Sequence, residues 1–379
     1  MPQQKTSSLK TYFDELEETN GDDECKAWLS RAFDSRAELV VFVAGRREGG
    51  GTGKCVGFLK GSFNISFRFS FGDGRPDVII RFPKPGHTAT AYRDEKVVYE
   101  VQIMEYLHQN TDIPIPRIHS WGLIAESPQH LGPFIIMDYV NGTLLSTISG
   151  LETTRSRKSV ANEHLIHLWT QRNLADDAEI AQERFIARHR FAQLVSNYYP
   201  EDCGLFIPFC DDLRPSNMLI DPETLRITAI LDFEFTNAMP AEFTYDPPWW
   251  LLLSGPEMWL ERCAMEEFLT LYEPRMEQFL RALERVEIEM ASEVKRPDVS
   301  SLSARMCDSW RTGRFWFDYA ARKSFDVDTI YWAALHNDGA GVELLDDKAR
   351  AEMEPFTQLK MEQLKAYKEE CSARFSSEM

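Results

Sequence analysis

Short apolar runs separated by turn-forming residues mark the second half of the chain. Residues 218–220 and 227–231 are largely aliphatic, and residues 221–224 between them read Asp-Pro-Glu-Thr. An apolar run of this length, bounded by a turn, is typical of a buried strand. The pattern therefore predicts a hairpin of two buried strands, whose open end brings the flanking residues together.

A second strand pattern lies in the first quarter of the chain. Residues 58–69 alternate around Gly61, and residues 77–82 form a β-branched run after the turn-forming segment 72–76. Alternation with a period of two, followed by a turn, predicts an antiparallel hairpin. Gly61 lacks a side chain, so it allows the backbone to approach a ligand closely.

Helical spacing accounts for much of the rest. Residues 92–107 predict an amphipathic helix because apolar side chains recur at helical intervals: Val97, Val101, Met104 and Leu107. Residues 134–140 predict a buried strand that runs into a turn. An apolar stripe at 276–286 predicts a further helix, which Pro274 should interrupt on its N-terminal side.

Polar residues suited to metal and phosphate chemistry flank the predicted C-terminal hairpin. Asn217 precedes its first strand, Asp232 follows its second strand, and Asp212 stands shortly before Asn217. Amide and carboxylate oxygens hold Mg²⁺ against ATP phosphates, and a nearby carboxylate can accept a proton from a substrate hydroxyl. Asn217 and Asp232 are therefore candidate metal ligands, and Asp212 is the candidate catalytic base.

These residues carry a resemblance to a known family, the aminoglycoside phosphotransferase and choline kinase-like enzymes, which are relatives of the protein kinases. Residues 210–217, Cys-Asp-Asp-Leu-Arg-Pro-Ser-Asn, are similar to the family's catalytic loop His-x-Asp-(Leu/Phe)-x-x-x-Asn. Residues 230–234, Ile-Leu-Asp-Phe-Glu, resemble its metal-binding Ile-Asp-Trp-Glu segment. Residues 246–253 resemble fungal phosphotransferase-like members. The chain departs from the family at Cys210, since a thiol is a weak hydrogen-bonding substitute for the His that braces the loop.

The resemblance implies an α+β, bilobal protein kinase-like fold with a small antiparallel β-sheet lobe and a larger, mostly helical lobe. We expect a helical or flexible extension at 1–54, a nucleotide-covering lobe at 55–137, a catalytic and substrate-binding lobe at 138–345 and a helical tail at 346–379. The implied activity is that of a small-molecule kinase, which transfers the γ-phosphoryl of ATP to a hydroxyl with Mg²⁺ as the second cofactor.

The resemblance also implies which residues contact the phosphates. The covering turn corresponds to Gly61, Ser62, Phe63 and Asn64. Arg81 stands where the family has its phosphate-binding Lys. Arginine keeps the positive charge, but its planar fork differs from the point charge of an ammonium, and Lys84 is the alternative cation.

Two more parts of the nucleotide site follow from the same resemblance. Glu100, on the predicted helix at 92–107, is expected to pair with the phosphate-binding cation, and Glu95 is the alternative. Adenine is expected to bind backbone groups near residues of the strand at 134–140, namely Met137, Asp138 and Val140.

Composition narrows the class of protein. The chain has 60 acidic and 42 basic residues and a net charge of −18, which argues against nonspecific binding to nucleic acid or to an anionic membrane. Its seven cysteines include no Cys-x-x-Cys pair and indicate reduced thiols, and no apolar run is long enough to span a membrane. We therefore expect a cytoplasmic protein whose partner is a hydroxylated small molecule; the sequence predicts no oligomeric state.

Two other motifs have simpler interpretations. Residues 48–55 resemble a P-loop, but Glu48 replaces its first Gly and Cys55 replaces the Ser or Thr that would hold Mg²⁺, so a loop is expected. His164 and His167 lack partners at metal-ligand spacing and are interpreted as structural or surface residues.

Alternatives to an active small-molecule kinase remain. Cys210 and Arg81 are also compatible with a catalytically impaired nucleotide-binding or scaffolding pseudokinase. A protein kinase is disfavoured, because Phe233 and Glu234 follow Asp232 where protein kinases have Phe-Gly, and no Ala-Pro-Glu segment follows. No residue in the sequence selects the acceptor.

Overall fold

The chain divides into two units in the computed structural model, which describes residues 15–140, 143–146, 161, 165, 168–169, 174–199, 205–234, 236–293, 301–336 and 341–375. The sheet unit comprises 14–152 and 210–237, and the helical unit comprises 1–13, 153–209 and 238–379. The predicted α+β class, with a small antiparallel sheet and a mostly helical remainder, is confirmed. The predicted domain boundaries at 54, 137 and 345 stay predictions.

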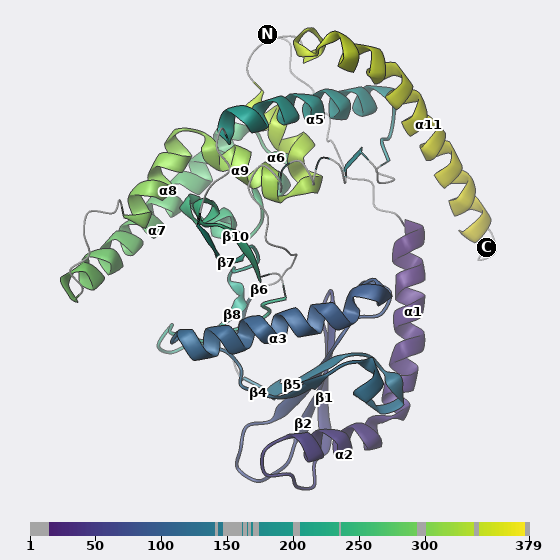
Figure 1. The fold of residues 1–379 in the computed structure, drawn as a ribbon, viewed down its shortest axis with the longest axis vertical. Helices are drawn as coiled ribbons and strands as arrows, with labels where there is room; N and C mark the ends of the chain where they lie inside the picture. Colours follow the sequence, from purple (N-terminus) through teal and green to yellow (C-terminus); the bar gives the residue numbers. More distant parts are fainter. Residues whose placement is uncertain are drawn as a thin grey trace. The chain divides into compact units, whose positions relative to one another are not determined.

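The sheet unit is built on a five-stranded antiparallel sheet with the order β1-β2-β3-β5-β4 (Figure 1). Its strands are β1 (Lys54–Lys60), β2 (Asn64–Ser70), β3 (Val78–Pro83), β4 (Ile118–Gly122) and β5 (Phe134–Asp138). The predicted hairpin is therefore confirmed as β2 and β3, joined by the turn at 72–76. In the P-loop-like segment, residues 48–53 form a loop with positive φ at Gly49, Gly50 and Gly51, and Lys54 and Cys55 begin β1.

Alternating side chains of β5 enter two different cores. Phe134 and Ile136 pack with residues of α1 (Glu15–Asp34) and α2 (Arg36–Arg46), including the buried Trp28. Ile135 and Met137 pack instead with the buried face of α3 (Arg93–Asn110). Because successive strand residues point to opposite faces, α1 and α2 cover one face of the sheet and α3 covers the other. The segment expected to be an extension thus contributes to the core of this unit.

This alternation determines where Arg81 points. Its neighbours Ile80 and Phe82 on β3 are fully buried in the core under α1 and α2. Arg81 therefore projects from the other face, toward α3, and pairs across the sheet with Ser66 of β2.

The predicted C-terminal hairpin is also confirmed. It consists of β8 (Ser216–Ile220) and β9 (Ile227–Ile230), which pair antiparallel, and β6 (Thr143–Ser146) completes a three-stranded sheet with the order β6-β8-β9. The Asp221 carboxylate stabilises the turn by accepting hydrogen bonds from the backbone N–H groups of Glu223 and Thr224 at 2.8 and 2.9 Å.

The helical unit packs around a large aromatic core that includes the fully buried Phe191, Tyr272, Phe315 and Phe317. Its helices are α5 (Ala178–Tyr198), α6 (Pro256–Leu260), α7 (Met265–Glu293), α8 (Leu302–Arg311), α9 (Arg314–Arg322), α10 (Val327–Ile330) and α11 (Asp347–Phe375). Strands β7 (Phe206–Cys210) and β10 (Thr236–Pro240) pair as a two-stranded sheet. His164 and His167 lie outside the described residues.

One helix prediction is wrong. Helix α7 runs through Pro274, which was expected to interrupt it. The proline removes one N–H donor from the helix, yet Phe268, Tyr272 and Met276 on both sides of it are buried in the same core. Burial of this continuous apolar face stabilises the helix across the proline.

The expected helical tail is α11, and it is packed along part of its length. It lies beside α5 (Figure 1), and Ala349 of α11 shares a small core with Phe185 and Ile186 of α5. Thr357, Lys360 and Tyr367 of α11 are buried. No helix among the described residues is long and apolar enough to cross a membrane.

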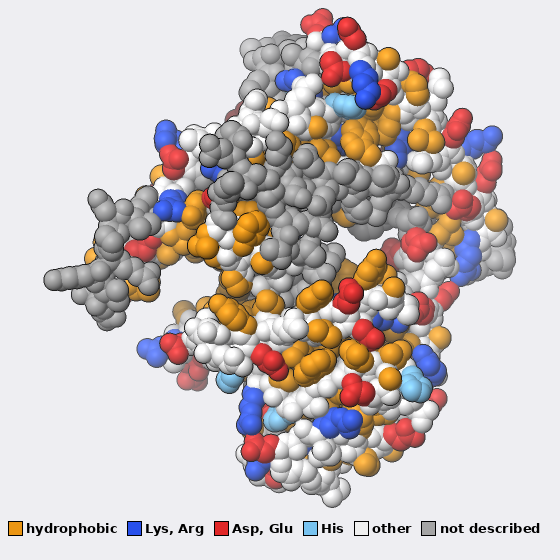
Figure 2. Space-filling model, viewed as in Figure 1, with side chains coloured by type: hydrophobic (Ala, Val, Ile, Leu, Met, Phe, Trp, Pro, Cys, Tyr) orange, Lys and Arg blue, Asp and Glu red, His pale blue; other side chains and the backbone are white. Residues whose placement is uncertain are grey.

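On the visible face of the sheet unit, acidic and basic side chains are interspersed with hydrophobic ones (Figure 2). The net charge of −18 is therefore not gathered into a single acidic patch on that face.

Candidate active site

Arg81 lies between two carboxylates that come from distant parts of the sequence. It forms an ion pair with Glu100 of α3, and its Nη1 lies 3.2 Å from Oδ1 of Asp232, just after β9. The Arg81 side chain is 12% exposed and that of Glu100 is 2% exposed, so both charges are largely removed from water. Of the two glutamates considered, Glu100 contacts Arg81, whereas Glu95 is exposed on α3.

Burial and charge shift the pKa values of this cluster. Burial raises the pKa of Glu100 to about 7, and the charges of Glu234 and Asp232 contribute in the same direction against the attraction of Arg81. The pKa of Asp232 is also raised, chiefly by burial and then by Glu234. Burial would lower the pKa of Arg81, but the three surrounding carboxylates outweigh it and raise that pKa. Arg81 is thus surrounded by three carboxylates, and two of them have raised pKa values.

Asp232 has a left-handed backbone conformation, with φ at 63°. Few residues other than glycine adopt this region, although Asp and Asn tolerate it better than most, and such strain is concentrated at functional sites. The preceding N–H, of Leu231, donates to the carbonyl of Asn217 at 2.7 Å. The structure thus brings Asn217 and Asp232 together, as the hairpin predicts.

Asp212 is held on both sides by polar partners. Its Oδ2 accepts a hydrogen bond from Nδ2 of Asn217 at 2.7 Å, and its Oδ1 lies 2.8 Å from Nε of Arg214. The same Asn217 nitrogen also donates to the Asp212 carbonyl at 3.0 Å. Asp212 is 1% exposed, so these contacts fix its carboxylate in one orientation.

The thiol of Cys210 occupies the position of the family's His. Burial raises its pKa to about 12. The thiol is therefore protonated at neutral pH and unsuited to act as a nucleophile. The carbonyl of Cys210 accepts from the N–H of Leu213 at 3.2 Å, so the loop still forms a hydrogen-bonded turn at this position.

The turn between β1 and β2 contains Gly61, Ser62, Phe63 and Asn64. The Gly61 N–H donates to the Asn64 carbonyl at 2.8 Å, and the Phe63 carbonyl accepts from the N–H of Lys84 at 2.6 Å. The Asn64 side chain turns toward Glu234 and donates to its Oε2 at 2.8 Å. This turn is thereby tied to the segment that carries Asp232.

A cavity of about 220 Å³ lies within the sheet unit. The predicted site residues that line it are Arg81, Glu100, Met137, Asp138, Val140, Asn217 and Asp232. Gly61, Ser62, Phe63, Asn64 and Asp212 are not among its lining residues. The cavity therefore joins the predicted adenine, phosphate and metal residues, which are far apart in the sequence.

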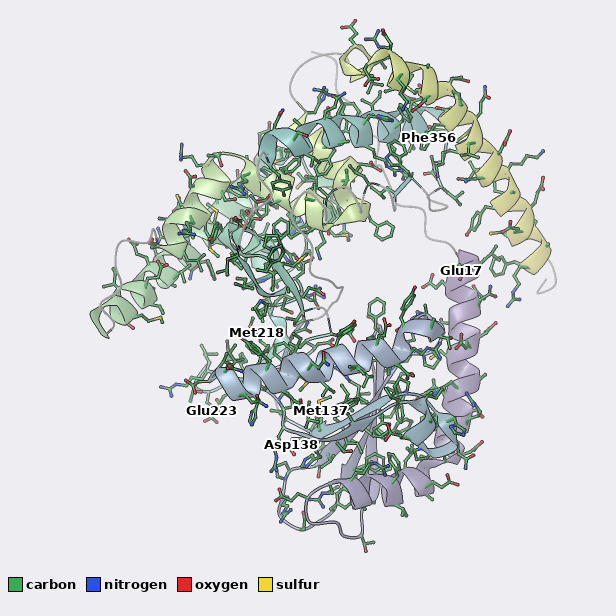
Figure 3. All side chains as sticks on the ribbon, viewed as in Figure 1. Glu17, Met137, Asp138, Met218, Glu223 and Phe356 are labelled. Atoms are coloured by element: carbon green, nitrogen blue, oxygen red, sulfur yellow. The ribbon has the colours of Figure 1, made fainter. Side chains whose placement is uncertain are left out.

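The end of β5 forms one wall of this cavity, with Met137 and Asp138 labelled in Figure 3. The N–H groups of Asp138 and Tyr139 are occupied, since they donate to the carbonyls of Arg117 and Asp77 at 3.0 and 2.7 Å. Within the described residues the Val140 N–H donates to no carbonyl, which leaves it available to a ligand. The Asp138 carboxylate contacts Nε2 of His119 at 2.6 Å.

Sequence reasoning assigned no role to two residues at this site. The Lys96 ammonium lies 2.8 Å from Oε2 of Glu234, whose side chain is 1% exposed. The available signals were local: Lys96 lies one helical turn before Glu100 on the same face, and Glu234 stands two residues after Asp232. Lys84, the alternative to Arg81, instead faces α1, with its Nζ 3.8 Å from Oδ1 of Asp22.

The side chains present fit Mg²⁺. Oδ1 of Asp232 contacts Arg81, and its second oxygen makes no hydrogen bond within the described residues; Oε1 of the buried Glu234 likewise has no partner there. No group of three or more His, Cys, Asp or Glu side chains among the described residues could hold a metal ion unaided. Mg²⁺ in nucleotide sites characteristically takes one or two carboxylates and completes its shell with phosphates and water.

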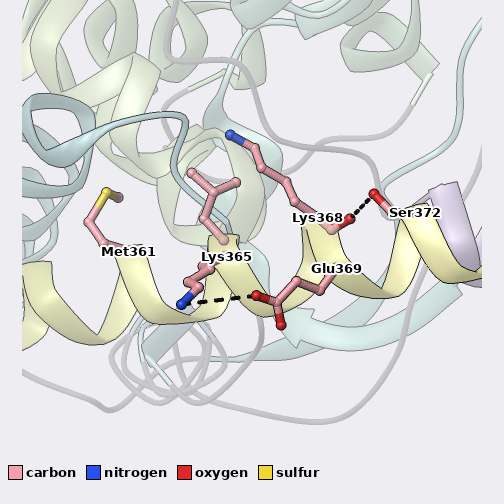
Figure 4. A pocket seen from close by; sticks show the side chains of 6 residues that line it. Met361, Lys365, Lys368, Glu369 and Ser372 are labelled. Atoms are coloured by element: carbon pink, nitrogen blue, oxygen red, sulfur yellow. Dashed lines mark hydrogen bonds and ion pairs between the residues drawn. The ribbon is translucent and has the colours of Figure 1, made fainter.

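A second hollow, of about 470 Å³, lies along α11 in the helical unit. Figure 4 shows that its side chains project from one helix, where Lys365 and Glu369 form an ion pair and the Ser372 hydroxyl donates to the Lys368 carbonyl. None of the predicted site residues lines it.

The chain is similar to known proteins in structure but not detectably in sequence. No protein-family model matches the chain, and no curated protein matches it. Among solved structures, it is similar to a provisionally assigned aminoglycoside phosphotransferase from Ralstonia eutropha, with 16% identity over 86% of this chain and 97% of that one and a TM-score of 0.40.

Two further solved structures are similar at comparable levels. An ethanolamine kinase from Plasmodium vivax shares 11% identity over 82% of this chain and 81% of that one, with a TM-score of 0.40. The aminoglycoside phosphotransferase APH(3'')-Id from Streptomyces rimosus, in complex with ADP and streptomycin, shares 16% identity over 64% of this chain and 95% of that one, with a TM-score of 0.34. The function proposed next is supported by the residues of the site and not by these likenesses.

Proposed function

We propose that this protein is a small-molecule kinase, which transfers the γ-phosphoryl group of ATP to a hydroxyl of its acceptor as the enzymes that its motifs resemble do. The observation that carries the proposal is the cavity that Arg81, Glu100, Asn217, Asp232 and the end of β5 line together. A site for a nucleoside triphosphate requires a strand end for the base, a cation for the phosphates and oxygen ligands for the metal ion, and this cavity combines all three.

The adenine would lie against the end of β5. Val140 would donate its N–H to a ring nitrogen, because the neighbouring N–H groups of Asp138 and Tyr139 are already engaged. Met137 would supply apolar contact at the inner wall of the cavity, since it is buried there. Such recognition requires backbone geometry and no special side-chain chemistry.

The phosphates would lie near Arg81 and under the turn at 61–64. Glu100 and Asp232 would orient the Arg81 guanidinium, so that its charge faces the phosphate oxygens without losing entropy at each turnover. Mg²⁺, held by Asn217 and Asp232, would supply the positive charge that stabilises the transferring phosphoryl group.

Asp212 would accept the proton of the acceptor hydroxyl while that oxygen forms its bond to phosphorus and the bond to the ADP oxygen breaks. Its contacts with Asn217 and Arg214 hold the carboxylate in a fixed position, which is what a general base requires. These two contacts explain how the Asp212 carboxylate can be buried and still carry its charge.

The test compares Asp212→Asn with Asp211→Asn, which changes the neighbouring carboxylate as a matched control. ATP consumption would be screened against hydroxylated metabolites, and ADP binding would be measured by calorimetry for each variant. We expect Asp212→Asn to lower kcat by roughly 10² to 10⁴ while ADP still binds, and Asp211→Asn to remain active. Equal turnover by wild type and Asp212→Asn would contradict the role of Asp212. Tight ADP binding with no transfer to any acceptor would instead indicate a pseudokinase.

A further inference from the structure

We infer that Lys96 of α3 is a second phosphate-binding cation, which contacts the terminal phosphates of the bound nucleotide alongside Arg81. This inference rests on the proposed nucleotide site and extends it. The resemblance assigns the phosphate contact to the β3 position, here Arg81, and gives Lys96 no part.

The position of Lys96 supports this role. Its Nζ lies 2.8 Å from Oε2 of Glu234 and 3.5 Å from the Phe63 carbonyl in the turn at 61–64. Lys96 and Glu100 lie one helical turn apart on the same face of α3, so both side chains project toward the sheet. The contact with the Phe63 carbonyl places the ammonium at the turn at 61–64, and the Lys96 side chain is 13% exposed.

Arg81 and Lys96 differ in how firmly the surrounding carboxylates hold them. Arg81 is shared by Glu100 and Asp232, and its rigid fork is fixed between them. The ammonium of Lys96 sits at the end of a flexible stem and has three rotatable donors, so it can turn toward a phosphate without moving the backbone. The positive charge of Lys96 also opposes the rise in the pKa of Asp232, so it acts on the proposed metal ligand.

Glu234 is arranged so that Lys96 can move. Its Oε2 also accepts a hydrogen bond from Nδ2 of Asn64 at 2.8 Å, which remains when the ammonium turns away. Its Oε1 is buried and accepts no hydrogen bond within the described residues, so the carboxylate can take another cation in exchange. When the ammonium turns to the phosphates, a bound Mg²⁺ ion nearby would compensate the negative charge of Glu234.

A purely structural role would have different consequences. If Lys96 only neutralised Glu234, its removal would damage the fold and weaken every ligand of the cavity, and removing both charges would restore binding. If Lys96 contacts phosphate, its removal would weaken phosphate-bearing ligands selectively. ADP and adenosine share the base and the ribose and differ in the diphosphate, so they separate the two roles.

The experiment measures calorimetric binding of ADP and adenosine, with Mg²⁺ and again with chelator, to the full chain and to four variants. Lys96→Met removes the cation, Lys96→Arg keeps a positive charge, and the double variant Lys96→Met with Glu234→Gln leaves no buried unpaired carboxylate and so protects the fold. Lys54→Met, on the exposed start of β1, is the matched control.

We expect Lys96→Met and the double variant to weaken ADP binding by about 10- to 100-fold, which corresponds to the loss of one charged hydrogen bond, while adenosine binding stays within about twofold. Lys96→Arg should retain most of the ADP affinity. Unchanged ADP affinity in Lys96→Met, or full recovery in the double variant, would overturn the inference and leave the proposed function intact. Failure of the wild-type chain to bind either ligand would overturn both.

Discussion

The backbones of Gly21 and Gly86 touch, so a methyl group added to either glycine would overlap the carbonyl oxygen of the other. Gly21 lies within α1, and Gly86 lies in the connection from β3 to α3, between Arg81 and Glu100. A polar contact reinforces this packing, since Oδ1 of Asp22 on α1 lies 3.2 Å from Nε2 of His87. Helix α1 is thus bound to the connection that precedes the helix carrying Glu100.

This contact reverses the usual effect of a helical glycine. Gly21→Ala should destabilise the protein by roughly 1–3 kcal/mol, the range for overpacking, although alanine normally stabilises a helix interior. Gly45 in α2 is the matched control, because nothing lies near a side chain added there, and Gly45→Ala should stabilise by roughly 0.5–1 kcal/mol. Urea unfolding measures both. If Gly21→Ala raised the unfolding free energy as much as Gly45→Ala does, α1 would not pack as described.

The left-handed backbone of Asp232 predicts different costs for two substitutions that both remove its charge. Asn tolerates a φ of 63° better than Ala does, so Asp232→Ala should cost roughly 1–2 kcal/mol more of the unfolding free energy than Asp232→Asn. Both should abolish the Mg²⁺-dependent part of stabilisation by ADP, which at 100 times the dissociation constant is about 2.7 kcal/mol in total. Thermal unfolding with and without Mg²⁺ tests this. Retention of the Mg²⁺-dependent shift in Asp232→Asn would remove Asp232 from the metal site.

Glu100 predicts a pH dependence of stability in the ligand-free protein. Its pKa rises from 4.5 to about 7 on folding, chiefly because of burial, so the unfolded state releases this proton first as pH increases. The contribution is therefore fully present below pH 4.5 and is lost as pH rises through 7. Compared with Glu100→Gln, the wild type should lose unfolding free energy across this window. Parallel curves for the two proteins would mean that folding does not raise the pKa of Glu100.

Lys360 predicts a dependence of the opposite kind. Burial, followed by the charges of Arg188 and Arg184, lowers its pKa from 10.5 to about 8, so between these values the unfolded state binds more protons. The charged Lys360 therefore lowers the unfolding free energy below pH 8, and this loss disappears as pH rises toward 10.5. Lys360→Met should therefore exceed the wild type in unfolding free energy at pH 7, and the difference should shrink by pH 10. The exposed Lys365→Met is the control, and a pH-independent difference for Lys360→Met would contradict the explanation.

Local patterns in the sequence predicted the parts of the site that depend on neighbouring residues. The apolar runs around residues 221–224 were sufficient for the β8–β9 hairpin, because a tight turn sets its register and brings Asn217 beside the residue before Asp232. Helical periodicity likewise predicted α3 and its buried apolar side chains Val97, Val101 and Met104. The choice of Glu100 over Glu95 came from the family resemblance and not from periodicity.

Contacts between distant segments could not be predicted this way. Lys84 was the alternative phosphate-binding cation because it lies three residues after Arg81. Its partner Asp22 comes from α1, a segment that was interpreted as an extension. Lys96 received no role from the sequence, because its partner Glu234 lies far along the chain. At Pro274 the local rule was correct about the missing hydrogen bond, but burial of Phe268, Tyr272 and Met276 outweighed it.

The three-stranded sheet also has a consequence for biosynthesis. Strand β6 pairs with β8, and the sequence between them belongs largely to the other unit. At ribosomal rates of roughly 5–20 residues per second, a nascent chain would display β6 for several seconds before β8 emerges from the exit tunnel. During this interval Arg81 and Glu100 are already synthesised while Asn217 and Asp232 are not, so the nascent chain has neither of the proposed metal ligands. The proposed kinase activity would therefore be possible only late in translation.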